Sequence, residues 1–238
     1  MAQNVFITGT GRKMALGFQF VRRYLEQGDT VIATVRKPSE ALEELQCEWP
    51  GKLHILVMDI ADSESVKAAA AEAEKLVPCL DLLINNATTY SPDSNKDFED
   101  FNLDYIADVI NVGAVGPLRV TQALLPLLKK SAGTALVVNI SSEAGSIGAC
   151  YRTNMLDYAM QKASLNMGTM TVFNNFKKDP KLNIICVQPG WMRTNEGNQM
   201  APNDPYVSAE TMRLLFEKKR EDKEGDRFIT FEGEKYPW

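Results

Sequence analysis

Six short runs of mostly apolar residues recur along this chain, at 5–8, 30–35, 53–57, 80–84, 135–140 and 183–187. They lack the alternation of a half-exposed sheet, which is typical of parallel strands buried on both faces. Helix-like stretches separate them, among them residues 15–27, 63–76 and 155–178. The alternation predicts an α/β fold with one doubly wound parallel sheet and helices on both faces. Because ligands bind such sheets beyond the carboxyl ends of the strands, the residues that follow each strand are the candidates for a site.

The composition favours a single domain over residues 1–238, because no Pro/Gly/Ser-rich linker divides the chain. A net charge of −5 argues against nucleic acid and anionic membranes as partners. No apolar run is long enough to span a membrane, and we expect no signal peptide. The four cysteines lack the spacing of a metal site. These features favour a reducing cytoplasm. The lone His54, in a strand-like run, disfavours a Ser-His-Asp hydrolase. The charged run at 217–227 is expected to be a solvated helix end and loop.

A glycine-rich turn, TGTGRKMALG at residues 8–17, follows the first strand and opens a helix. Gly9, Gly11 and Gly17 would let the backbone approach a pyrophosphate, whose charge the free N–H groups at the helix start stabilise. In this position the turn favours a Rossmann-like dinucleotide site over an ordinary tight turn.

The end of the second strand indicates which dinucleotide is bound. It carries Arg36 and Lys37, whereas an NAD site usually has a carboxylate there for the ribose hydroxyls. Arg36, with Lys37 and Arg12, would instead hold a 2′-phosphate through charge-assisted hydrogen bonds. NADP(H) is therefore the predicted cofactor.

A candidate proton donor lies in DYAMQK, residues 157–162, where Tyr158 stands four positions ahead of Lys162. On a helix these positions share one face, so the phenol and the ammonium would point into the same cleft. A nearby cation favours the phenolate and would bring the phenol closer to proton transfer at neutral pH. The spacing alone is weak evidence, because a pair of this kind also arises by chance.

Taken in order, these features resemble the classical short-chain dehydrogenases/reductases, and within them the sniffer-like and C-factor-like carbonyl reductases. The long gap between Ser142 and Tyr158 and the ending FITFEGEKYPW match those carbonyl reductases. Three residues depart from the family pattern, and the glycine turn is longer than usual. The departures are Thr88 for a glycine, Gln161 for a serine and Asn195 for an aspartate.

The resemblance implies a role for each matching residue. Tyr158 would donate a proton to the substrate oxygen, and Ser142 would hydrogen-bond the same oxygen. Lys162 would lower the phenol pKa and bind the nicotinamide ribose, while Asn111 would hold a water molecule. The expected catalytic residues are Asn111, Ser142, Tyr158 and Lys162. The expected cofactor-binding residues are Gly9, Gly11, Arg12, Gly17, Arg36, Asp59, Ile60, Asn86, Ala87, Tyr158, Lys162, Pro189, Gly190 and Thr194.

The substrate is expected to be a small hydrophobic ketone or aldehyde, or the corresponding alcohol. Loops 88–98, 143–157 and 191–205 would wall its pocket with aromatic and sulfur-bearing residues, and Glu143 would be a polar anchor. Loops on this fold change specificity while the sheet stays the same, so the sequence does not identify the compound.

Two further expectations concern partners and rival functions. The helical stretches 105–128 and 158–176 are apolar on more than one side, which favours a homodimer or homotetramer, in line with the family. The main alternative to an enzyme is a non-catalytic NADP-binding protein with a regulatory or signalling role. A flavin-binding protein of the same fold is a weaker alternative.

Overall fold

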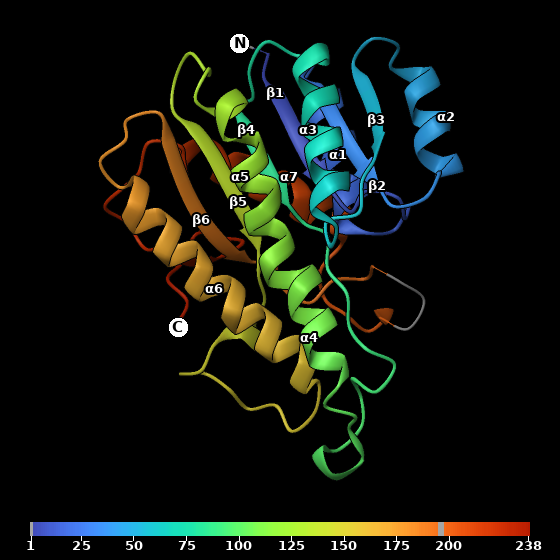
Figure 1. The fold of residues 1–238 in the computed structure, drawn as a ribbon, viewed down its shortest axis with the longest axis vertical. Coiled ribbons are helices and arrows are strands. Elements are labelled where there is room, and N and C mark those ends of the chain that lie inside the picture. The colour runs from blue at the N-terminus through green and yellow to red at the C-terminus, as the bar shows by residue number, and fades with distance from the viewer. Residues whose placement is uncertain (1, 195–197) are drawn as a thin grey trace.

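All six predicted runs become strands of one parallel sheet (Figure 1). The structure is a computed structural model and describes residues 2–194 and 198–238. The strand order is β3-β2-β1-β4-β5-β6-β7, so the chain starts in the middle of the sheet and winds outward on both sides. This confirms the predicted doubly wound, Rossmann-like α/β fold. The strands are β1 (Asn4–Thr8), β2 (Thr30–Val35), β3 (Leu53–Val57), β4 (Leu82–Asn85), β5 (Ala135–Ile140), β6 (Leu182–Gln188) and β7 (Phe228–Thr230).

Two hydrophobic cores lie on opposite faces of the sheet, because successive side chains of a strand point to opposite sides. Val5 and Ile7 of β1 pack into the core under α1 and α7, whereas Phe6 packs into the core under α3, α5 and α6. In Figure 1, α3, α5 and α6 lie in front of the sheet, and α1 and α7 lie behind it. The helices are α1 (Leu16–Glu26), α2 (Glu40–Glu48), α3 (Ser63–Leu76), α4 (Tyr105–Ile110), α5 (Gly116–Leu128), α6 (Leu156–Phe176) and α7 (Pro205–Lys219).

Helix boundaries follow local signals in the sequence. Asp62 caps α3, since its carboxylate accepts hydrogen bonds from the N–H groups of Glu64 and Ser65, both at 3.2 Å. The expected continuous helix over 105–128 is instead α4, a π-helical turn (Asn111–Val115) and α5. Such turns often occur at functional sites, and this one begins at an expected catalytic residue.

A seventh strand, β7, was not predicted and extends the sheet beside β6. The expectation of a solvated run at 217–227 is wrong at its end, because Arg227 is only 4% exposed. Its guanidinium donates to Asn183 Oδ1 at 2.9 Å and lies 4.7 Å from the ring centroid of Phe173. A buried cation needs such partners. Arg227 therefore anchors the chain against β6 just before β7 begins.

Two searches covered residues 2–194 and 198–238. No helix in these ranges is both long and apolar enough to cross a membrane. Nor do three His, Cys, Asp or Glu side chains gather there in a way that could hold a metal ion. The carboxyl ends of the strands remain the place to look for chemistry.

Candidate active site

A cavity of about 530 Å³ lies where the fold predicts a site, lined by residues at the carboxyl ends of β1 to β6 and in the segments that follow them. Its polar end is formed by residues that follow β1 and β2, and its other end by residues of α6 and the segment after β6. Eleven of the sixteen expected site residues line it, namely Gly9, Gly11, Arg12, Arg36, Ile60, Asn86, Ala87, Tyr158, Lys162, Pro189 and Thr194.

Five expected site residues do not line the cavity: Gly17, Asp59, Asn111, Ser142 and Gly190. Each is the direct chain neighbour of a residue that does line the cavity. Asn195, one of the departures from the family pattern, lies outside the described residues.

The glycine turn brings two backbone segments unusually close together. A Cβ on Gly9, whose φ is +72°, would lie 2.7 Å from the Cα of Ala87. A Cβ on Gly17 would lie 2.4 Å from the carbonyl oxygen of Gly9. The Asn86 side chain donates to the same oxygen at 3.1 Å. Gly9 is thus required by its positive φ and by the close approach of Ala87, and Gly17 by the close approach of the Gly9 carbonyl, so the glycine signal has two physical origins.

The end of the cavity beside β2 is cationic. Arg12, Arg36 and Lys37 line it, and none of the described lining residues is Asp or Glu. Ser39 joins the loop after β2 to the loop after β1, because its Oγ donates to the Gly11 carbonyl oxygen at 2.7 Å. An anionic group such as a phosphate is therefore the ligand chemistry that fits this end.

Asp59 and Asn111 are engaged with the loop between β3 and α3. The Asp59 carboxylate accepts from the N–H of Ala61 at 2.9 Å, and its neighbour Ile60 lines the cavity instead. The Asn111 amide donates to the Ala61 carbonyl oxygen at 3.2 Å, and its oxygen accepts from Arg119 at 3.0 Å. Both side chains shape the turn beside the cavity, and their carboxyl and amide groups are already hydrogen-bonded there.

Tyr158 and Lys162 lie one turn apart on α6 and both line the cavity, as the spacing predicted. The Lys162 ammonium lies 5.5 Å from the Tyr158 ring centroid and donates to the Ile140 carbonyl oxygen at 2.8 Å. Lys162 is 2% exposed, and this burial lowers its pKa to about 7. Burial also raises the pKa of the Tyr158 phenol above its ordinary value. In the free protein, desolvation therefore outweighs the lowering of the phenol pKa expected from Lys162.

Ser142 precedes a short 3-10 turn (Glu143–Gly145) that follows β5. Its hydroxyl donates to the Glu143 carboxylate and accepts from the N–H of Ala144 at 3.2 Å. Arg152, from the loop before α6, forms an ion pair with Glu143 through Nε at 3.1 Å and through Nη2. Ser142 is thus hydrogen-bonded to a charged pair whose cationic member, Arg152, the sequence analysis missed.

The loop after β4 is tied to α6 by residues that depart from the family pattern. Thr88 Oγ1 donates to Gln161 Oε1 at 3.1 Å, so two of the three departures contact each other. Asp157, also missed, is fully buried and accepts from Ser91 N at 2.6 Å and from Ser94 Oγ at 2.7 Å. The residue directly before Tyr158 therefore holds this loop against the start of α6.

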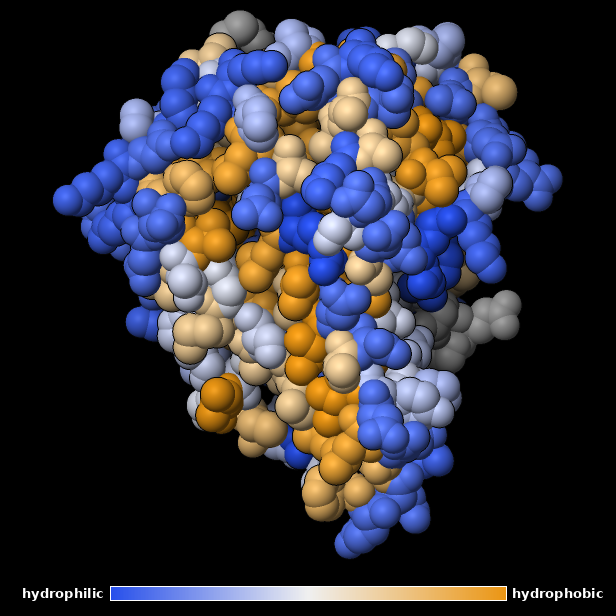
Figure 2. Space-filling model, viewed as in Figure 1, coloured by the Kyte–Doolittle hydropathy of each residue, from blue (hydrophilic) through white to orange (hydrophobic). Residues whose placement is uncertain are grey.

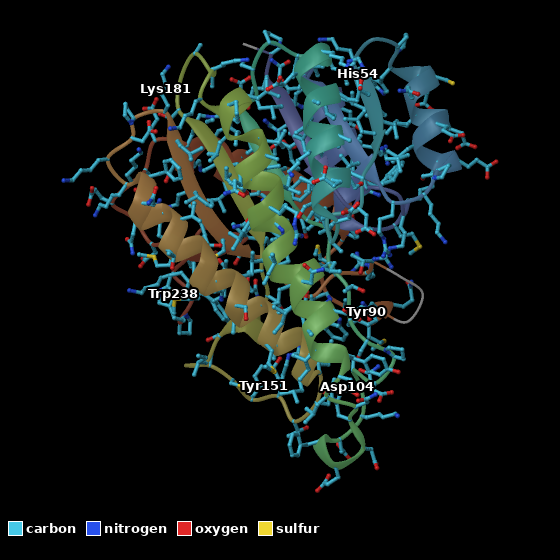
Figure 3. All side chains as sticks on the ribbon, in the orientation of Figure 1. His54, Tyr90, Asp104, Tyr151, Lys181 and Trp238 are labelled. Carbon is cyan, nitrogen blue, oxygen red and sulfur yellow. The ribbon has the colours of Figure 1, made fainter. Side chains whose placement is uncertain are left out.

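The expected apolar wall of a substrate pocket lies at the amino end of α6. Tyr90 and Tyr151 are both exposed and lie at this end of the molecule (Figure 3). Met192 is buried and lines the cavity, whereas Trp191 beside it is exposed. Aromatic side chains with free faces at the rim can receive an apolar ligand.

Comparison with known proteins identifies the family. A family model described as short chain dehydrogenase matches residues 3–204. The chain belongs to the short-chain dehydrogenase family. An uncharacterized oxidoreductase of Schizosaccharomyces pombe is 33% identical over 213 residues, which cover 85% of this chain and 80% of that protein. C-signal of Myxococcus xanthus is 29% identical over 162 residues, 67% of this chain and 93% of that protein.

Solved structures agree with this assignment over the whole fold. An NADPH-bound carbonyl reductase from chicken fatty liver aligns with a TM-score of 0.89 and 29% identity, covering 100% of this chain and 99% of that one. The carbonyl reductase Sniffer of D. melanogaster aligns with a TM-score of 0.91 and 25% identity, covering 100% of both chains. The resemblance to short-chain dehydrogenases/reductases with sniffer-like and C-factor-like relatives is confirmed. The chain is thereby placed among the short-chain oxidoreductases, with carbonyl reductases as structural neighbours.

Proposed function

We propose that residues 1–238 form one NADPH-dependent oxidoreductase domain that reduces the carbonyl of a small, hydrophobic ketone or aldehyde, or catalyses the reverse alcohol oxidation. The observation that carries the proposal is a single cavity lined at one end by Arg12 and Arg36 and at the other by Tyr158 and Lys162. The first pair suits an anionic cofactor, and the second suits proton transfer. The NADPH-bound carbonyl reductase among the structural neighbours supports the same assignment.

The residues present fit NADP(H). Gly9 and Gly11 line the cavity without side chains that would block a pyrophosphate, and the cationic end suits the 2′-phosphate. When bound, the cofactor supplies a hydride at its nicotinamide. Asn86, Ala87, Pro189, Thr194 and Lys162, which line the remainder of the cavity, would hold its ribose and nicotinamide parts.

The chain itself supplies the proton and the orientation. Tyr158 would donate its phenolic proton to the substrate oxygen, and the raised pKa keeps that proton on the phenol at neutral pH. Lys162, with its pKa of about 7, would regain positive charge on binding an anionic cofactor. The exposed aromatic residues Tyr90, Tyr151 and Trp191 would receive the apolar part of the substrate.

The first test concerns the cofactor. NADPH should bind at least about tenfold more tightly than NADH, a difference of ~1.4 kcal/mol, because Arg36 lies where a carboxylate would select NADH. Arg36→Ala should remove most of this preference, whereas Arg22→Ala, on the exposed side of α1, should leave it intact. Fluorescence titration of the unmutated protein and both variants with NADPH and with NADH measures this preference. Equal affinity of the unmutated protein for both cofactors would refute the assignment.

A second candidate function is a non-catalytic NADP-binding protein with a regulatory or signalling role, for which the C-signal relative is the specific support. A pure binding protein has no need of a phenol and a lysine together in its cavity, which favours the enzyme. The enzyme and the binding protein are distinguished by testing a panel of ketones and aldehydes as substrates while NADPH oxidation is monitored at 340 nm. Turnover with any member supports the enzyme, and binding without turnover across the panel supports the rival.

The homodimer or homotetramer stays a prediction. Figure 2 shows apolar residues along the front of the molecule over α5 and α4. Val115, Met160 and Met167 on and beside these helices are exposed, as expected for a face that meets another copy. A particle larger than the 26.5 kDa chain in light scattering is the expected finding.

A further inference from the structure

Two pairs of residues lie on neighbouring faces of α6. Tyr158 and Lys162 line the cavity, and Asp157 and Gln161 stand one position earlier with the same spacing. Residues four apart share one face of a helix, and a step of one residue turns that face by about 100°. Asp157 and Gln161 are fully buried, and both bind the loop at residues 88–94, which follows β4. One face of α6 thus carries the proposed chemistry, and the next face carries this loop.

Gln161 connects the loop to the π-helical turn as well. Its Oε1 accepts a hydrogen bond from Thr88 Oγ1 at 3.1 Å, and its Nε2 donates to the Thr89 carbonyl oxygen. A Cβ on Gly113 would lie 1.4 Å from the same Oε1, so the glutamine side chain occupies the space that a larger residue at 113 would need. The serine of the family pattern has a shorter side chain and no amide. Thr88 and Gly113 therefore match the glutamine at 161.

Asp157 holds the other half of the loop. Its carboxylate accepts hydrogen bonds from Ser91 N at 2.6 Å and from Ser94 Oγ at 2.7 Å. Burial raises the pKa of Asp157, but these hydrogen bonds outweigh burial and hold it below its ordinary value, so the carboxylate is charged at neutral pH. Hydrogen bonds to a charged acceptor are among the strong ones. The N–H of Met155, a residue with a left-handed φ of +59°, also donates to the Ser94 carbonyl oxygen at 2.7 Å and fixes the end of the loop to the start of the helix.

The hydrogen bonds of Asp157 and Gln161 to residues 88–94, here termed the α6 clamp, reach the cavity directly, because Thr88 lines it. Resting on the proposed function, we propose that Asp157 and Gln161 are positioning residues that fix this loop on α6 and so hold one wall of the substrate site in place relative to Tyr158. A carbonyl compound then meets a wall that is already ordered, and no binding free energy is lost in ordering it. The Thr88 hydroxyl donates its one proton to Gln161, so that proton is not available to a polar substrate. Both effects favour an apolar ligand of defined shape.

The first test measures the loop in the free protein. Gln161→Met keeps a side chain of similar length beside Gly113 but cannot hydrogen-bond the loop as glutamine does. Amide hydrogen exchange of peptides that cover residues 88–94, followed by mass spectrometry, should speed up about tenfold or more, because two hydrogen bonds are lost. Asp157→Asn should act in the same sense, since it leaves one acceptor oxygen. The matched control Gln27→Met, exposed at the end of α1, should leave this exchange unchanged.

The second test is the kinetics of the best substrate in the ketone and aldehyde panel. In Gln161→Met, KM should rise about tenfold while kcat and NADPH affinity change little, because binding to the wall is weakened and Tyr158 and Lys162 remain. A residue that only supports the fold would lower the free energy of unfolding in urea and leave KM unchanged. Thr88→Val removes one of the hydrogen bonds from the loop side, so the rise in KM caused by Gln161→Met should be smaller in a Thr88→Val background.

Unchanged exchange over residues 88–94 in both Gln161→Met and Asp157→Asn would show that the loop is not clamped and would overturn the inference. Faster exchange with an unchanged KM, or a rise in KM of equal size in the Thr88→Val background, would overturn the positioning role. Faster exchange together with a raised KM supports it. If no carbonyl of the panel is reduced although the exchange is faster, the proposed function fails while the α6 clamp stands.

Discussion

Tyr158→Phe is expected to lower kcat for carbonyl reduction by about 10²–10⁴-fold, the usual contribution of a general acid. The change removes one hydroxyl and keeps a ring that lines the cavity, so NADPH affinity and stability should change little. Stopped-flow or steady-state NADPH oxidation at 340 nm measures the effect, with cofactor affinity titrated separately.

The matched control for this variant is Tyr24→Phe. Tyr24 is fully buried in α1, and its hydroxyl has no hydrogen-bond partner among the described residues, so its loss should leave kcat unchanged. If Tyr158→Phe retained more than about a tenth of the activity, Tyr158 would not be the proton donor. The non-catalytic rival would then become the better account.

Lys162→Met is expected to have two large effects of opposite kind. NADPH affinity and turnover should fall, because the ammonium is lost from the cavity wall. The free energy of unfolding at pH 6–7 should rise by up to about 5 kcal/mol, because burial lowers the Lys162 pKa from 10.5 to about 7 and each unit costs ~1.4 kcal/mol. An active-site group that destabilises the fold is the usual compromise between stability and function.

The stabilisation of the fold by Lys162→Met should depend on pH. Above pH 10.5 the lysine is neutral in both folded and unfolded chains, so the wild-type protein loses nothing by burying it. The cost grows as the pH falls from 10.5 to about 7 and is constant below that. Urea denaturation should therefore show the stabilisation of Lys162→Met at pH 6 shrinking toward pH 10. The exposed Lys130→Met is the control, and an equal stabilisation at both pH values would contradict a buried, neutralised Lys162.

The sequence predicted those parts of the fold that have a strong local signal. Five of the six predicted strands are apolar runs buried on both faces, whereas β3 lies at the sheet edge and Val57 at its end is exposed. Helix α3 begins where Asp62 supplies a cap. The strand β7 has only three residues, and its position depends on the buried Arg227 and its partner Asn183 on β6. Contacts between residues that far apart in the chain leave no local pattern to detect.

The site residues also divide into those with a local sequence signal and those without one. Tyr158 and Lys162 were found because helical spacing places i and i+4 on one face, and the cationic end because it follows a strand directly. The ion pair of Glu143 with Arg152 joins two loops, and the hydroxyl of Ser142 is oriented by it only in the folded chain. Asp59 stays a predicted cofactor contact, and the hydrogen bond that its carboxylate accepts from Ala61 became visible only in the folded chain.

The central claim is that this cavity joins an NADPH site to a carbonyl-reducing proton donor. Its most direct measurement is the fate of the label from NADPH deuterated at C4 of the nicotinamide, with a ketone or aldehyde identified in the panel. The account predicts an alcohol with deuterium on the former carbonyl carbon, formed by the wild-type protein and almost absent with Tyr158→Phe. NADPH that binds but transfers no deuterium to any member of the panel, or deuterium found at a C=C carbon instead, would contradict it.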